Sequence, residues 1–296
     1  MKNQRTSTAH VLLCVGAIAL AAAEAAAQPA HVVNGKLETH AAGPSLEQTF
    51  RALVTASRAP AWIGYDVPAA ARQQMCCFDS TRRFGPCSGC RLESMHAFTF
   101  QASPPRVIEV GGVPRLVVLI RTEAGRVDVA HVLSPECGID VGGLTLHWLE
   151  GVHPSQSLAL LSGLIATARD EDLWEPAVSA ISLHGDPTAD ALLVGLARRD
   201  PRQEVRSHTL FWLAQRAGDR AVAMIRQAIE EDPELEVKQQ AVFALSELPN
   251  HEGVPLLIGI ARKHRHPEVR RQAFFWLGES EDPRALAFFE EVLASR

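Results

Sequence analysis

The hydrophobic pattern of the C-terminal half predicts a stack of short helices. From Asp200 onward the chain falls into blocks with a period of 32 residues, and each block contains two apolar segments of helical spacing separated by a turn. Equivalent positions carry a valine, a basic residue, a phenylalanine and a leucine: Val205, Val237 and Val269; Arg206, Lys238 and Arg270; Phe211, Phe243 and Phe275; Leu213, Leu245 and Leu277. Such periodic agreement is typical of a repeat protein.

Turn residues predict where these helices begin. Asp200 and Asp232 each precede a proline, so we expect each aspartate to cap the first helix of its block. The second helices are expected to begin near Asp219, Gly253 and Asp282. With a degenerate earlier copy at 172–199, the sequence predicts about four two-helix repeats over 171–296. Two short helices cannot bury their apolar sides alone, so the repeats should stack into an α-solenoid.

A different pattern precedes the repeats and predicts a small α+β domain over 45–150, followed by a connecting helical segment at 151–170. The apolar positions alternate like strands in several places and follow helical spacing in others. The expected elements are a helix at 45–57 capped by Ser45, a strand at 61–68, a hairpin at 114–133 turning at 122–125, a last strand at 144–149 and a helix at 155–168. The whole chain is therefore expected to be mainly α.

The N-terminus has the layout of a signal peptide. Lys2 and Arg5 precede the apolar run Val11 to Ala23, which is too short to span a bilayer, and small residues then lead to Gln28. We expect cleavage after residue 27, which places the mature protein in the periplasm or outside the cell, with no membrane span. Residues 28–44 mix Ala, His, Gly and Pro without a period, so we expect a flexible leader there.

Charge argues against a nucleic-acid partner. Removing Lys2, Arg5 and Glu24 leaves 27 basic and 33 acidic residues, a net charge of −6. A protein that binds phosphate backbones usually has a basic balance.

Five cysteines remain in the mature chain, four of them within a short loop-like stretch: Cys76, Cys77, Cys87, Cys90 and Cys137. An exported protein can form disulfides, so we expect bridges with one cysteine left over; the sequence does not give their connectivity. Two alternatives stay open. Cys87 and Cys90 could bind zinc together with two other cysteines, or one of this CxxC pair could be a redox-active thiol.

Aromatic residues in the first helices of the repeats have two interpretations: Phe211, Trp212, Phe243, Phe275 and Trp276. A helix inside a stack needs more than one apolar stripe, so these side chains could be core. If part of this set is exposed, it could instead form the hot spot of a binding surface.

The repeat blocks, with Pro, then Val followed by a basic residue, then an apolar run ending in Leu, resemble short HEAT-like repeats of the phycobilisome-lyase type. The layout of the chain, with AWIGYDVP, QMCCF and GGLTLHWLEGV ahead of the repeats, is similar to that of exported bacterial HEAT-repeat domain-containing proteins. The resemblance implies an α-solenoid and, as a remote alternative, an activity like that of a bilin lyase.

Catalytic motifs such as a nucleophile elbow, a phosphate-binding loop or HExxH are not found in the sequence. We therefore expect a non-enzymatic scaffold or adaptor without a cofactor, which binds an envelope protein or peptide through the solenoid. The alternative is a metal-binding or thiol-redox protein that uses the cysteine cluster.

Overall fold

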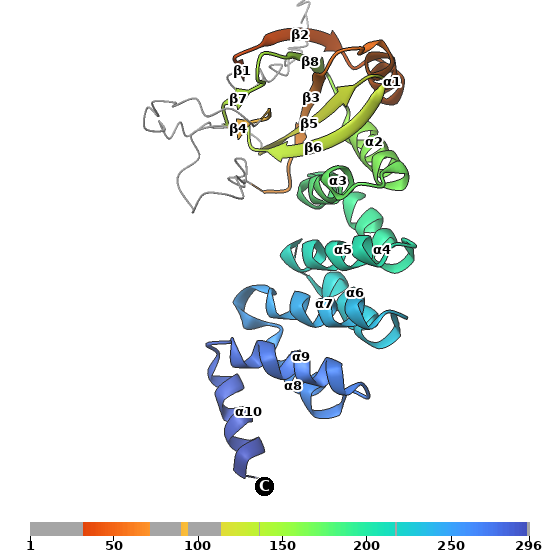
Figure 1. The fold of residues 1–296 in the computed structure, drawn as a ribbon. Coiled ribbons are helices and arrows are strands. Elements are labelled where there is room, and N and C mark those ends of the chain that lie inside the picture. Colours follow the sequence, from red (N-terminus) through yellow and green to blue (C-terminus); the bar gives the residue numbers. More distant parts are fainter. Residues whose placement is uncertain (1–31, 72–89, 94–113, 136, 217, 295–296) are drawn as a thin grey trace, which may run out of the picture.

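The computed structural model describes residues 32–71, 90–93, 114–135, 137–216 and 218–294, and shows a β-sheet region at one end of a column of helices (Figure 1). The expected signal peptide and Cys76, Cys77 and Cys87 lie outside the described residues. Within the described ranges, none of the helices has the length and apolar character needed to cross a bilayer.

The strands form two sheets. Their bounds are β1 Val32–Val33, β2 Lys36–Ala41, β3 Ala61–Pro68, β4 Cys90–Arg91, β5 Arg115–Glu123, β6 Arg126–Leu133, β7 Ile139–Asp140 and β8 Thr145–Glu150. The larger sheet has the order β2-β8-β3-β5-β6, in which β2, β8 and β3 are parallel and β5 and β6 antiparallel. The smaller sheet, β1-β7-β4, is parallel.

The predicted strand at 61–68 is the middle of the larger sheet because it is apolar on both faces. Trp62 points into a core shared with Val117 and Trp148, whereas Ile63 and Tyr65 belong to the core beneath the helices. Both faces of β3 are therefore covered, which explains why its apolar residues run almost continuously rather than alternating.

The predicted hairpin is confirmed. β5 and β6 pair antiparallel around Ala124 and Gly125, which have φ values of 50° and 74°. Two central residues with positive φ match the right-handed twist of the flanking strands, and Gly125 adopts this conformation without strain.

The prediction of a flexible leader at 28–44 is wrong for the part that the structure describes. β1 and β2 lie there, and β2 pairs with β8 along its whole length, from Lys36 opposite Thr145 to Ala41 opposite Glu150. Only Leu37 is a large apolar residue in β2, and it is 42% exposed. An edge strand is held by backbone pairing, so it needs no apolar periodicity of its own.

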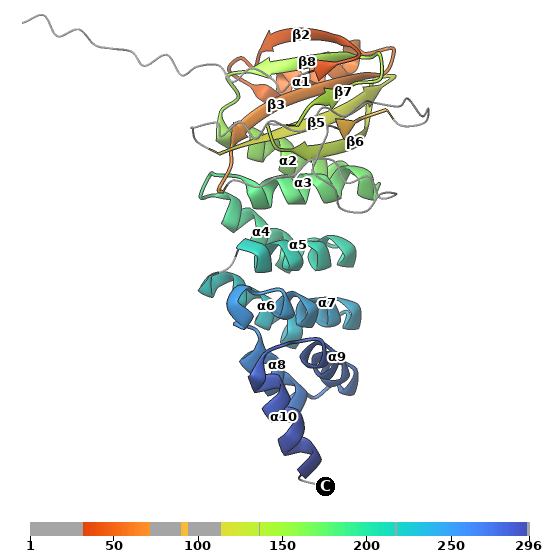
Figure 2. The same cartoon turned by 90° about the vertical axis from the view of Figure 1, so that its left-hand side faces the viewer.

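Most of the helices follow the sheet region and form a layered stack, whereas α1 lies between β2 and β3 in the chain. Their bounds are α1 Leu46–Ala56, α2 Pro154–Thr167, α3 Glu171–Leu183, α4 Ala189–Arg199, α5 Gln203–Arg216, α6 Asp219–Glu231, α7 Leu235–Ser246, the 3₁₀ turn η1 Pro249–His251, α8 Val254–Lys263, α9 Pro267–Gly278 and α10 Pro283–Ala294. Helices α3, α5, α7 and α9 lie side by side, and α4, α6 and α8 each pack against the two members of this row that flank them in sequence (Figure 2).

The second helices begin where predicted, but the Asp-Pro pairs do not cap the first helices. Asp200 and Asp232 are the C-cap residues of the preceding helices, α4 and α6. Helices α5 and α7 begin three residues further on. Each aspartate instead accepts a hydrogen bond from the backbone N–H two residues later, at Arg202 and Glu234. The pair therefore shapes the turn between repeats, because a short side chain can mimic a backbone turn.

The sheet region and the helices share one core. A single cluster of buried apolar residues runs from Ala42 in the sheet region to Phe288 in α10. The backbone also joins them, because Ala70 N–H donates to Leu183 O (2.9 Å) and Gly185 N–H donates to Pro68 O (2.8 Å). The end of β3 is thus fastened to the loop between α3 and α4.

Candidate functional site

The predicted aromatic residues form a continuous row across three neighbouring helices. Phe211 on α5 stacks on Phe243 on α7 with centroids 6.1 Å apart and planes inclined by 5°, and Phe243 contacts Trp276 on α9 at 4.7 Å. The repeat explains the row: equivalent positions on helices stacked side by side bring their side chains together.

The two remaining members extend this aromatic row sideways. Trp212 packs edge-on against Phe211 at 5.4 Å, and Phe275 packs edge-on against Trp276 at 4.9 Å. In α9 it is Trp276, not the repeat-equivalent Phe275, that continues the stack. Phe275 therefore points outward and is 53% exposed.

The row lies at the surface of the helical layer rather than in its centre. Phe211, Trp212, Phe243 and Trp276 are half-buried, whereas the core positions Leu213, Leu245 and Leu277 are 3%, 0% and 1% exposed. Complete burial in the core does not describe these rings, although Trp212 and Trp276 pack against it. Half-buried aromatic side chains offer a large, rigid contact area at a small cost in conformational entropy.

A histidine closes one end of the row. His208 on α5 lies between Trp174 on α3 (5.6 Å) and Trp212 (6.3 Å), and Trp212 Nε1–H donates to His208 Nε2 at 2.9 Å. This bond leaves the proton of the neutral ring on Nδ1. Burial lowers the pKa of His208 to about 4, and a hydrogen bond with the backbone of Glu175 has a smaller effect in the opposite direction. Burial and the nearby Glu171 and Asp172 raise the pKa of the Glu175 carboxyl.

The basic position of the repeat is structural. Arg206 donates to Asp200 O and to both carboxylate oxygens of Asp232. At the equivalent positions, Lys238 donates to the carbonyls of Ile229 and Glu230, and Arg270 donates to His264 O. Apart from the Asp232 carboxylate, the acceptors are backbone carbonyls at or just beyond the ends of second helices, where cations are favoured. The basic residue that recurs in each repeat thus joins that repeat to the one before it.

The cysteine cluster is described only in part. Cys90 begins β4, where its backbone lies opposite Ile139 of β7, and Cys137 is 2% exposed. The other three cysteines lie outside the described residues, so the pairing of the thiols stays a prediction.

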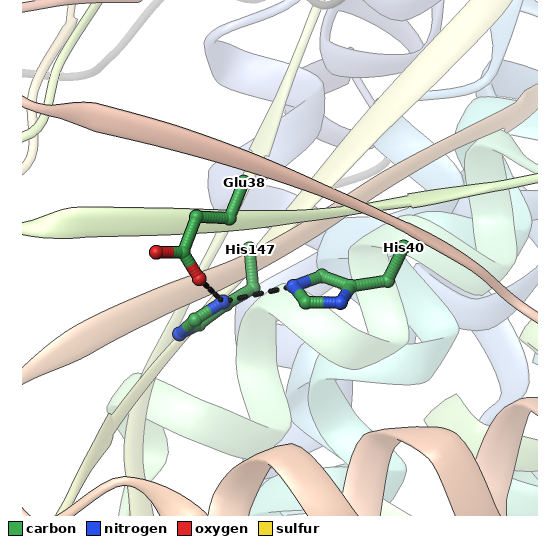
Figure 3. A group of neighbouring side chains, drawn as sticks. All are labelled: Glu38, His40 and His147. Carbon is green, nitrogen blue, oxygen red and sulfur yellow. Dashed lines mark hydrogen bonds and ion pairs between the residues drawn. The ribbon is translucent and has the colours of Figure 1, made fainter.

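A second group of functional side chains, which the sequence analysis missed, lies at the edge of the larger sheet. Glu38 and His40 project from the same face of β2, because they are two residues apart, and Glu38 lies opposite His147 of β8. Figure 3 shows the Glu38 carboxylate and the His40 imidazole both approaching the same nitrogen of the His147 ring. His147 Nδ1 lies 3.1 Å from His40 Nε2 and 3.3 Å from Glu38 Oε2.

The electrostatics of this Glu38-His40-His147 cluster favour a charged carboxylate beside a neutral imidazole. Burial lowers the pKa of His147, with a smaller opposing effect from Glu38. A hydrogen bond from Lys36 lowers the pKa of Glu38; Lys36 Nζ contacts the other carboxylate oxygen, Oε1, at 2.6 Å. Period-two spacing of Glu and His in KLETHA was the only trace of this cluster in the sequence.

Comparison with known families supports the assignment of the helical region. A family model described as HEAT repeats matches residues 222–296, which covers α6 to α10 apart from the start of α6. No curated protein matches the chain. Residues 222–296 are thus similar to HEAT repeats, and the sheet region and helices α1 to α5 lie outside the match.

Proposed function

We propose that this protein is an exported, non-enzymatic scaffold that binds a protein or peptide of the cell envelope through the aromatic row of its HEAT-repeat region. The observation that carries the proposal is the row itself: half-buried rings on three stacked helices, ending in the exposed Phe275. HEAT repeats commonly mediate protein–protein interaction. Large aromatic side chains dominate the binding energy of such surfaces.

In this proposal the solenoid comprises four repeats, α3–α4 to α9–α10, and the sheet region is rigidly attached to its first repeat. The shared core and the hydrogen bonds between β3 and the α3–α4 loop support that attachment. A rigid attachment lowers the entropic cost of binding a partner that contacts both regions. Export rests on the signal-peptide pattern of residues 1–27.

Site-specific photocrosslinking in the producing cell tests the binding surface. Benzoylphenylalanine replaces Phe275, where an outward aromatic side chain already stands, and in a matched control it replaces the exposed Arg226 on α6. The proposal expects discrete adducts from position 275 that position 226 does not give. It also expects Trp276→Ala in the same background to weaken them. Equal adducts from both positions, or none from position 275, would contradict it.

Mass spectrometry of the protein from the periplasm or medium tests export and the disulfides together. We expect an N-terminus near Gln28 and one free thiol among the five remaining cysteines after alkylation under denaturing conditions. An intact N-terminus with six alkylated thiols, Cys14 included, would contradict both parts.

A further inference from the structure

The Glu38-His40-His147 cluster directs three electron-pair donors at a common point, independently of the proposed binding surface. The backbone fixes this arrangement, because β2 and β8 are parallel and Glu38 is the register partner of His147. All three ligand atoms lie within 4.8 Å of one another, and all three residues are half-buried. β2 is the edge strand, so the cluster is covered by sheet on one side only.

Hydrogen bonding at His147 Nδ1 cannot serve both of its neighbours, His40 Nε2 and Glu38 Oε2. Nδ1 of a neutral His147 carries either a proton or a lone pair. If it carries the proton, it can donate to Glu38 Oε2, but then it cannot accept from His40 Nε2. If it carries the lone pair, it can accept from His40, but then it faces the carboxylate oxygen at 3.3 Å without a proton between them. A cation placed among the three atoms would accept a lone pair from each.

The two separations at His147 Nδ1 suit such a cation. Two ligands about 2.0–2.1 Å from a tetrahedral zinc lie roughly 3.3 Å from each other. The separations of 3.1 and 3.3 Å at His147 are close to that value. Two imidazoles and one carboxylate are also a donor set that binds zinc and leaves a fourth position open.

We propose that Glu38, His40 and His147 bind one divalent transition-metal ion, zinc being the ion to test first. His40 supplies Nε2, His147 supplies Nδ1 and Glu38 supplies Oε2, while Lys36 orients the carboxylate through Oε1. Lys36 is exposed, with 71% of its side chain accessible, so water screens its repulsion of the ion. The fourth coordination position would be left to water or to a ligand from solution.

The test uses the full mature chain, produced without a histidine tag, stripped of metal and titrated with zinc against a chromophoric chelator. X-ray absorption of the loaded protein then identifies the ligands. We expect one zinc per chain with nitrogen and oxygen at about 2.0–2.1 Å and no sulfur at about 2.3 Å. His147→Ala should weaken binding at least a hundredfold and Glu38→Gln at least tenfold. The matched control His251→Ala, which removes an exposed histidine from η1, should leave the affinity unchanged.

Three outcomes would overturn the proposal. The wild-type chain does not bind zinc; or its zinc has sulfur ligands, which would place the metal in the cysteine cluster; or His147→Ala and His40→Gln bind zinc as tightly as the wild type. The first two outcomes need no variant, so they decide the matter even if a substitution impairs folding. A thermal unfolding scan of each metal-free variant identifies that case.

Discussion

The buried polar groups of the helical region and the half-buried ones at the edge of the larger sheet are paired in different ways. In the repeats, Arg206 and Lys238 are 7% and 4% exposed, yet backbone carbonyls or carboxylate oxygens accept from both of them. At the sheet edge, His147 is approached by two groups that its single Nδ1 cannot both satisfy. Burial alone therefore does not identify a site. Arg206 and Lys238 recur with the repeat and are paired, so they are architecture, whereas His147 Nδ1 has two competing neighbours and no repeat equivalent, which makes it a candidate for ligand binding.

The largest loss of stability is expected from Arg206→Met, which removes one of the paired buried groups of the repeats. The substitution removes the partner of Asp232, whose side chain is 7% exposed, and several bonds to the loop before α5. Leaving a buried carboxylate unpaired should cost about 3–5 kcal/mol of the free energy of unfolding, measured in urea. The exposed Arg226 on α6 provides the control, because Arg226→Met should change stability very little.

Acid should be the next strongest perturbation, acting through His208. Its folded pKa of about 4 lies below the ordinary value of 6.5, so above pH 6.5 both states are neutral and stability does not depend on this group. Below pH 6.5 the unfolded state binds the proton first, and stability falls until about pH 4, by up to roughly 3 kcal/mol.

His208→Gln sharpens that prediction, because glutamine stands at the equivalent positions 240 and 272 and can still accept from Trp212. We expect the variant to resemble the wild type at pH 7.5 and to lose less stability on transfer to pH 4.5, as measured by urea unfolding at each pH. His184, whose pKa burial also lowers to about 4, keeps part of the acid sensitivity in both proteins. Parallel pH profiles for the two proteins would refute the role of His208.

Within the aromatic row, Phe243→Ala and Phe275→Ala should separate packing from binding. Phe243 contacts rings on both sides, so its removal should cost about 2 kcal/mol, less than for a fully buried phenylalanine. Phe275 is 53% exposed, and its removal should cost under about 1 kcal/mol. Phe243→Ala should also weaken the adducts formed by the crosslinker at position 275. If Phe275→Ala unfolds the protein as readily as Phe243→Ala does, the row is part of the core after all.

The smallest effect should come from the joint between the two regions. A methyl group at Gly185 would lie 3.0 Å from Ala69 O, so Gly185→Ala should cost about 1 kcal/mol. Because the core is continuous, we expect sheet and helices to unfold together in a single calorimetric transition, at a lower temperature than in the wild type. Gly163→Ala in α2, where nothing lies within 4 Å, should instead stabilise by up to about 1 kcal/mol.

Local sequence patterns predicted much of this fold. The strand at Ala61–Pro68, the hairpin of β5 and β6, the helix capped by Ser45 and the starts of the second helices all depend on residues near one another in the chain. The aromatic row was also visible, because a 32-residue repeat places equivalent side chains on neighbouring helices. Its exposure was not, because that depends on how far the helices rotate when they pack.

The sequence by itself determined the repeat, the position of the aromatic residues and the basic residue that joins successive repeats, since each follows from a period along the chain. Only the tertiary structure decided that β2 is a strand and that it pairs with β8. This pairing joins His40 to His147 across 107 residues, and no local pattern encodes it because an edge strand is held by backbone hydrogen bonds. The Glu38-His40-His147 cluster therefore exists only once the sheet has formed, and its three donors meet because strand register, rather than spacing in sequence, brings them to one face.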